Sequence, residues 1–104
     1  MSDTQAAAGG GALRPVLRLV ARDERRGTTV ARDAGPEGLT IGRTPDNGMV
    51  LPDLDRFVSG RHAVIDHADG QFRVTDTSTN GTYVNGETSA LGAGQTRVLR
   101  PGDR

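Results

Sequence analysis

The sequence has no cysteine, no lysine, few aromatic residues and no excess of charge of either sign. Without cysteine the chain can form neither a disulfide nor a thiolate site. Its arginines balance its acidic residues, and this neutrality argues against nucleic-acid binding, which needs an excess of positive charge. Because lysine is absent, a phosphate-binding loop of the Gly-x4-Gly-Lys type is excluded.

Long apolar runs are missing as well. No stretch approaches the ~18 apolar residues that a membrane-spanning helix needs, and the amino terminus lacks the basic start and apolar core of a signal peptide. We therefore expect a cytoplasmic protein with no membrane partner. Residues 1–12 are small and polar and predict a flexible leader. Residues 13–104 are enough for one domain with a small core of Val, Leu, Ile and Ala.

Apolar residues alternate with polar ones over short stretches, which predicts β-strands. Turn signals separate these stretches, and Asp69-Gly70 is typical of a tight hairpin. No window carries the apolar spacing of a helix. The fold class predicted from this pattern is all-β, an antiparallel sandwich. The predicted strands are residues 15–22, 28–32, 39–41, 61–66, 71–76, 82–84 and 96–100.

Three polar clusters lie where predicted strands end or begin, and we expect each to be on a loop. They are Gly42-Arg43, Ser59-Gly60-Arg61-His62 and the segment from Thr77 to Thr82. Loops held by a rigid sheet are common positions for binding groups. The clusters supply arginines, hydroxyls and amides, and this inventory suits the capture of an anion better than it suits a chemical reaction.

These clusters resemble the motifs of the forkhead-associated (FHA) domain, a phosphothreonine-binding β-sandwich. The matching segments are Ile41-Gly42-Arg43, Val58 to Ala63 and Asp76 to Gly86, in the order and strand context of the family. The loop sequences, including Leu51-Pro52-Asp53, are similar to those of FHA domains of type VI secretion systems. The resemblance implies a phosphopeptide-binding signalling or adaptor module.

The same resemblance implies which residues bind. Arg43 and Ser59 match phosphate-contacting positions, and Thr79 matches a further contact near the phosphothreonine. Asn80 matches the residue that bonds the peptide backbone, and Asn85 matches a position that also reaches that backbone. Each has a plainer interpretation from the residues alone: a solvated loop arginine, turn-forming hydroxyls, or Asn-Gly hairpin turns. For Asn85 the hairpin turn is at least as well supported.

One position departs from the family pattern. The residue after Ser59 usually assists the ligand, but here it is Gly60, so one contact is missing. Arg61 is the candidate to replace that contact, and we include it among the binding residues. Three further residues are expected to be architectural: Gly42, His62 and Gly81. FHA domains also continue past the motif Pro101-Gly102-Asp103, so we expect the last two strands to be lacking from residues 13–104.

Two rival functions remain open. An enzyme is disfavoured because Ser59, His62 and Asp76 lack a nucleophile elbow, so no catalytic residue is assigned. No cofactor or metal is predicted, because two histidines without cysteine give no zinc spacing and Asp53 to Phe57 fails the calcium-loop pattern. The second rival is a phosphate-independent docking scaffold. The expected partner is a threonine-phosphorylated protein or peptide, such as a serine/threonine kinase or its substrate.

Overall fold

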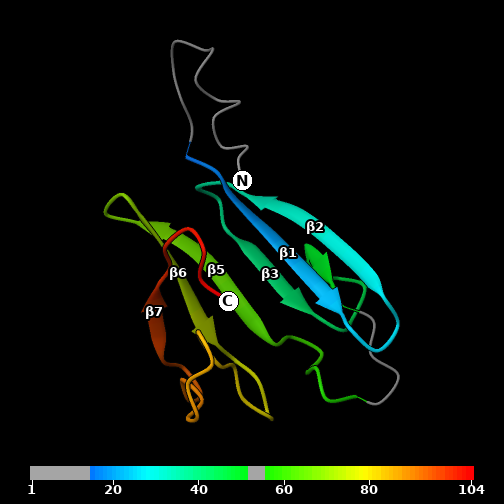
Figure 1. The fold of residues 1–104 in the computed structure, drawn as a ribbon. Coiled ribbons are helices and arrows are strands. Elements are labelled where there is room, and N and C mark those ends of the chain that lie inside the picture. Colours follow the sequence, from blue (N-terminus) through cyan, green and yellow to red (C-terminus); the bar gives the residue numbers. More distant parts are fainter. Residues whose placement is uncertain (1–14, 52–55) are drawn as a thin grey trace.

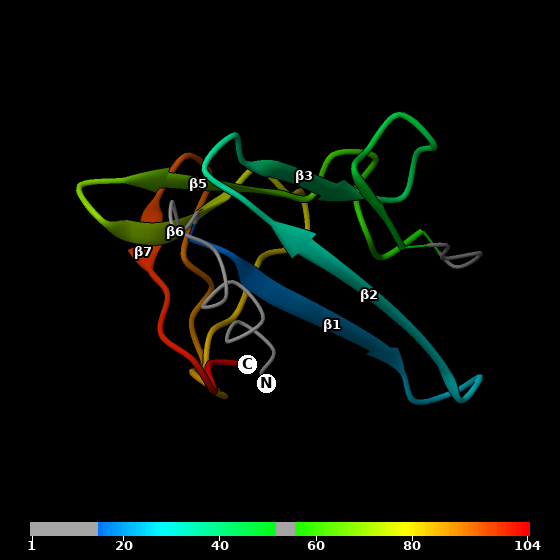
Figure 2. The ribbon, with the colours of Figure 1, turned by 90° about the horizontal axis from the view of Figure 1, so that it is seen from above.

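The computed structural model describes residues 15–51 and 56–104. These residues form two β-sheets stacked as two layers (Figures 1 and 2). Within these ranges there is no helix long and apolar enough to cross a membrane. The predicted leader, residues 1–12, lies outside the described residues. The strands are β1 (Leu17–Asp23), β2 (Thr28–Ala34), β3 (Leu39–Gly42), β4 (Met49–Val50), β5 (Ala63–Ala68), β6 (Gln71–Asp76) and β7 (Thr96–Val98).

The first sheet is the antiparallel pair of β1 and β2. The predicted alternation of β1 is confirmed, since Leu19 turns inward while Val20 is 60% exposed. Strand β2 is longer than predicted and continues to Ala34, where we expected a turn. The reason is packing: Ala34 pairs with Leu17 and is completely buried in the core, so the chain stays extended until it has passed the core.

The second sheet has five strands in the order β4-β3-β5-β6-β7. The hairpin of β5 and β6 turns at Asp69 and Gly70, as predicted, and both residues have the positive φ that a tight hairpin turn requires (54° and 77°). One pair departs from the predicted antiparallel arrangement. Strand β4 runs parallel to β3, which it joins through the loop of residues 43–48.

The predicted strand at residues 82–84 is wrong. The Thr82 amide donates to the Asp76 carboxylate (3.1 Å), and the Thr82 carbonyl accepts the amide of Leu91 (2.9 Å). The backbone of this segment is therefore satisfied within the long connection between β6 and β7 instead of in a sheet. Val84 is nevertheless 4% exposed, which explains the apolar signal in the sequence.

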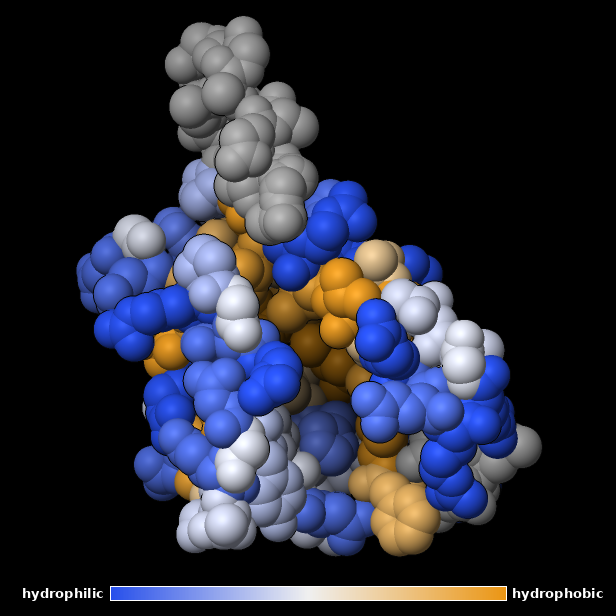
Figure 3. All heavy atoms as spheres, in the orientation of Figure 1, coloured by the Kyte–Doolittle hydropathy of each residue, from blue (hydrophilic) through white to orange (hydrophobic). Residues whose placement is uncertain are grey.

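The core lies between the two sheets, and it is open on one side. Its buried centre, Ala34, Ala63, Ile65 and Val74, is flanked by half-buried apolar residues. On the face shown in Figure 3, apolar side chains line a hollow between β1 and residues 98–104. Among the described residues β1 pairs only with β2. The absence of two further strands stays a prediction.

Candidate functional site

The three polar clusters follow or precede the ends of β3, β5 and β6 that lie in the lower half of Figure 1, and hydrogen bonds join them. The backbone amide of Arg43, just after β3, donates to the carbonyl of Ser59 (3.0 Å). The amide of Thr79, in the connection after β6, donates to the Ser59 hydroxyl (2.8 Å). The Asn80 side chain donates to the carbonyl of Phe57 (2.9 Å). Four of the predicted binding residues, drawn from three separate loops, are thus brought together.

His62 links two of these loops. Its Nδ1 accepts the Ser59 amide (3.0 Å), so its Nε2 carries the hydrogen and donates to the Gly81 carbonyl (3.0 Å). Its own backbone bonds Ile41 on one side and Thr77 on the other. One neutral imidazole therefore sets the spacing between the segment that carries Ser59 and the segment that carries Thr79.

Arg43 differs from the other half-buried arginines. In residues 15–51 and 56–104 three arginines are half-buried, and two of them, Arg73 and Arg97, make two-pronged bonds to Asp66 and Glu87. Within those ranges no carboxylate pairs with Arg43. Its guanidinium donates instead to the neutral carbonyl of Val58 (2.5 Å). The loop cluster therefore contains a partly desolvated positive charge that no described carboxylate neutralises, which favours an anionic ligand.

Close contacts explain why two of these positions are glycine. A Cβ on Gly42 would collide with the Gly60 carbonyl oxygen and lie 2.9 Å from the Arg61 Cα. Gly81 has φ of 102°, a conformation that side chains rarely adopt, and a Cβ there would lie 2.9 Å from the Ala90 Cβ. Both glycines allow the loops to approach one another, in keeping with the architectural role expected of them.

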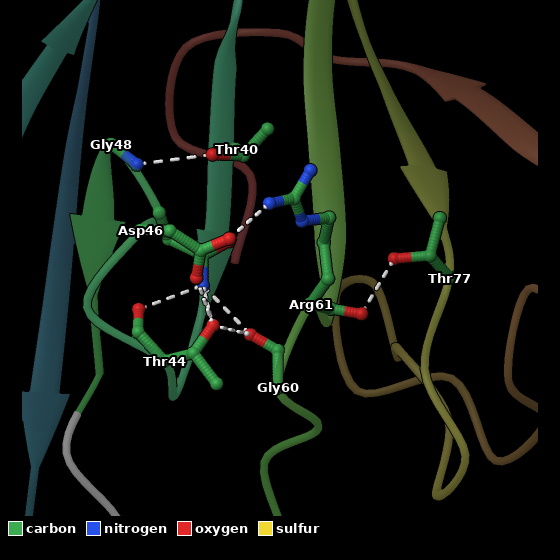
Figure 4. Close-up of polar contacts among 8 residues, drawn as sticks. Thr40, Thr44, Asp46, Gly48, Gly60, Arg61 and Thr77 are labelled. Atoms are coloured by element: carbon green, nitrogen blue, oxygen red, sulfur yellow. Dashed lines mark hydrogen bonds and ion pairs between the residues drawn. The ribbon is translucent and has the colours of Figure 1, made fainter.

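A second polar network holds the loop after β3 against Gly60 (Figure 4). Asn47 is buried, and its amide nitrogen donates to the carbonyls of Thr44 (2.9 Å) and Gly60 (2.7 Å). The Thr44 hydroxyl donates to Asp46, whose other oxygen receives the Arg61 guanidinium (2.5 Å). The Thr44 hydrogen bond, followed by that of Arg61, lowers the pKa of Asp46. Arg61 is thus directed to Asp46.

The side chain of Asn85 bonds the carboxyl-terminal segment and none of the other predicted binding residues. Its side-chain nitrogen donates to Asp103 (3.1 Å), and its side-chain oxygen accepts the amide of Arg104 (2.9 Å). Its φ is 55°, the left-handed conformation of a turn residue. Asn85 therefore lies in a turn, as in the plainer interpretation, but the turn does not join two strands, and its side chain holds the carboxyl-terminal segment.

A scan of protein families matches residues 39–104, more than half of the chain, to the model of the FHA domain. This chain belongs to the FHA family. FHA domains are phosphothreonine-peptide-binding modules of signalling proteins, and the domain itself is a binding unit rather than a catalyst.

Several FHA proteins are similar to this domain. It is 39% identical over 77 residues to the probable serine/threonine-protein kinase fhkA of Dictyostelium discoideum, and that match covers 65% of this chain and 12% of the kinase. The FhaA FHA domain, solved in complex with the intracellular domain of Rv3910, is 33% identical with a TM-score of 0.57, over 85% of this chain and 86% of that one. Mycobacterium tuberculosis EmbR, solved with a low affinity phosphopeptide, is 28% identical with a TM-score of 0.60, over 83% and 21%.

The structural role of one residue in this FHA domain, Asp76, was not predicted from the sequence. It is 1% exposed, at the end of β6. Its carboxylate accepts hydrogen bonds from the amides of Ser78 (2.9 Å), Thr82 (3.1 Å) and Gly92 (3.2 Å). It also accepts from the hydroxyls of Ser78 (2.6 Å) and Thr82 (2.9 Å). The hydroxyl residues that follow Asp76 at short spacing were the available signal in the sequence.

Proposed function

We propose that this FHA domain binds a threonine-phosphorylated protein through Arg43 and Ser59, and that it serves as a signalling adaptor. The observation that carries the proposal is the half-buried guanidinium of Arg43, which has no carboxylate partner among the described residues and lies beside Ser59. A phosphothreonine brings about −1.5 to −2 charge and three strong acceptor oxygens, which complement this arginine. Arginine is well suited to the task because its planar fork can hold two phosphate oxygens.

The neighbouring groups complete the proposed site. Because the Ser59 oxygen already accepts the Thr79 amide, its hydroxyl hydrogen can be donated to a phosphate oxygen. Thr79 and Asn80 are both exposed at the same end of the molecule, where Asn80 has an amide oxygen and nitrogen to offer a peptide backbone. Arg61 contributes only if it leaves Asp46. We leave Asn85 out of the proposed site because its amide is bonded to Asp103 and Arg104.

The relatives support the class of partner. EmbR was solved with a phosphopeptide, FhaA was solved with an intracellular protein domain, and fhkA is named as a kinase. We therefore propose that the partner is a serine/threonine kinase or a substrate of one, met in the cytoplasm. The chain spans only 12% of the kinase relative, so kinase activity is not carried over. A role in a type VI secretion system stays a prediction that is based on the loop sequences.

Replacing Arg43 with alanine tests the proposal. We expect the variant to lose at least about tenfold in affinity for a phosphothreonine peptide, because a charge-assisted hydrogen bond is worth about 1.5–3 kcal/mol. Arg43→Lys should recover only part of this affinity, since an ammonium cannot make the two-pronged contact. Isothermal titration calorimetry with a phosphothreonine peptide library and the matched unphosphorylated library measures the effect.

Arg97→Ala is the matched control, because it removes another half-buried arginine that the proposed site does not use. It should bind phosphopeptide as the wild type does. The rival function, a phosphate-independent scaffold, makes a different forecast: wild-type protein would bind both libraries equally, and Arg43→Ala would change neither affinity. That result would overturn the proposed function.

A further inference from the structure

Arg61 and Asp46 form an ion pair beside the proposed phosphate site (Figure 4). Arg61 directly follows Gly60, and a Cβ on Gly60 would lie 3.9 Å from an Nη atom of Arg43. Asp46 belongs to the same loop as Arg43 and is joined to it through Thr44, whose hydroxyl donates to the Asp46 carboxylate. A negative charge and a second guanidinium therefore both lie next to the arginine that we propose holds the phosphate.

This ion pair has no evident structural purpose. The side chains of Arg61 and Asp46 are 52% and 63% exposed. Exposed ion pairs contribute little to stability, since water screens the charges and two long side chains lose freedom. The loop is already fixed without the pair, because the buried Asn47 amide ties the carbonyls of Thr44 and Gly60 together. We therefore expect the pair to affect the charge that the site presents to a ligand.

We infer that Asp46 restrains the affinity of the phosphate site by holding Arg61 away from the bound peptide. This inference rests on the proposed function and concerns the same site. Gly60 offers no side-chain donor, and as long as Asp46 retains Arg61 the phosphate depends on Arg43, the guanidinium that we propose binds it. Asp46 also adds a negative charge that repels a dianion. Asp46 is therefore a determinant of specificity that weakens acidic ligands and makes binding depend on the contacts of Arg43.

Removing the Asp46 charge should accordingly strengthen binding. The variant removes one negative charge from the loop that carries Arg43, and the proposed ligand has about two negative charges. We expect the Asp46→Asn variant to bind a phosphothreonine peptide roughly three- to tenfold more tightly than the wild type. Asparagine keeps an oxygen that can accept the Thr44 hydroxyl, so the loop should keep its conformation.

The experiment compares five proteins by calorimetry with one phosphothreonine peptide that has alanine at its flanking positions. They are wild type, Asp46→Asn, Arg61→Gln, the double variant Asp46→Asn/Arg61→Gln, and Glu87→Gln. Glu87→Gln is the matched control, because it removes the same charge from another ion pair with an arginine, Arg97, outside the proposed site. Thermal melts check that each variant is folded, and Asp46→Ser replaces Asp46→Asn if the latter does not fold.

The inference predicts a gain for Asp46→Asn, a loss for Arg61→Gln that is smaller than that for Arg43→Ala, no change for Glu87→Gln, and loss of most of the gain in the double variant. If the wild type binds the phosphopeptide but Asp46→Asn shows no gain, or no more gain than Glu87→Gln, the inference is overturned and the proposed function stands. A loss for Arg61→Gln as large as that for Arg43→Ala would also overturn it. If the wild type does not distinguish phosphorylated from plain peptide, both the proposed function and the inference are overturned.

Discussion

Replacing Gly42 with alanine is expected to destabilise this FHA domain by about 3 kcal/mol or more, at the upper end of what overpacking costs. The new methyl group would collide with the Gly60 carbonyl oxygen, lie 2.8 Å from the Gly60 carbonyl carbon and lie 2.9 Å from the Arg61 Cα. All three are backbone atoms, so no side-chain rotation can relieve the contact. The end of β3 and the segment before β5 would have to separate.

That separation would also disrupt the proposed site. The hydrogen bond from the Arg43 amide to the Ser59 carbonyl lies in the same contact, so Arg43 and Ser59 would move apart. Urea unfolding and phosphopeptide titration measure the two effects together. Gly60→Ala is the matched control for stability: its Cβ would lie 3.2 Å from the Thr44 methyl group, which can shift, and we expect a loss below about 1 kcal/mol. Equal losses for the two variants would contradict this explanation.

The strands that could be predicted from the sequence are those with enough residues to show alternation. Strand β1 alternates over seven residues, and the β5–β6 hairpin has both alternation and the Asp69-Gly70 turn. Strand β4 has two residues, so no period can be seen, and its parallel pairing with β3 depends on how the intervening loop folds. At residues 82–84 a strand was predicted where the structure has none, because three residues with one buried valine have the same pattern in a strand and in a loop.

The sequence was enough to predict which loops form the candidate site. It was not enough to predict which side chains contact one another there. Resemblance to the family singled out Arg43, Ser59, Thr79 and Asn80, and the strand pattern indicated that they lie at strand ends. The pair of Asp46 and Arg61 was not predictable, since the two residues are fifteen positions apart and nothing in the sequence connects the candidate binding residue Arg61 with Asp46. The role of Asp76 was missed for a different reason. A carboxylate at a strand end is usually solvated, and nothing local shows that its donors arrive from as far away as Gly92.

Replacing Asp76 with asparagine is the second change with a large expected effect. The Asp76 carboxylate accepts five hydrogen bonds, from Ser78, Thr82 and Gly92, in a buried position. Asparagine puts an NH2 group in place of one oxygen, and that group must face at least two N–H or O–H donors. Because each unsatisfied buried group costs about 1–3 kcal/mol, we expect a loss of about 3 kcal/mol or more.

Urea unfolding measures this loss, and Asp66→Asn is the matched control. Asp66 forms a two-pronged bond with Arg73, but its side chain is 46% exposed. The same change of charge should therefore cost less than about 1 kcal/mol. The connection between β6 and β7 carries Thr79 and Asn80, so Asp76→Asn should also weaken phosphopeptide binding at a temperature where it is still folded. If Asp76→Asn lost no more unfolding free energy than Asp66→Asn, the five hydrogen bonds of Asp76 would not be a major source of stability.

The contribution of the Asp76 carboxylate should also appear in how the unfolding free energy of the wild type depends on pH. Burial raises the pKa of Asp76, but the hydrogen bonds from Ser78 and Thr82 outweigh it and lower the pKa from the ordinary value of 3.8 to about 2. A pKa that is lower in the folded state gives stability that is present above about pH 4 and is lost as the pH falls through about 2. The shift corresponds to about 2 kcal/mol.

Asp76→Asn cannot titrate at this position, so the difference in unfolding free energy between wild type and variant should narrow by about that amount between pH 5 and pH 2. A difference that stays constant over this range would mean that Asp76 has the same pKa in the folded and unfolded chains, and the network around it would then stabilise the fold without preferring the charged form.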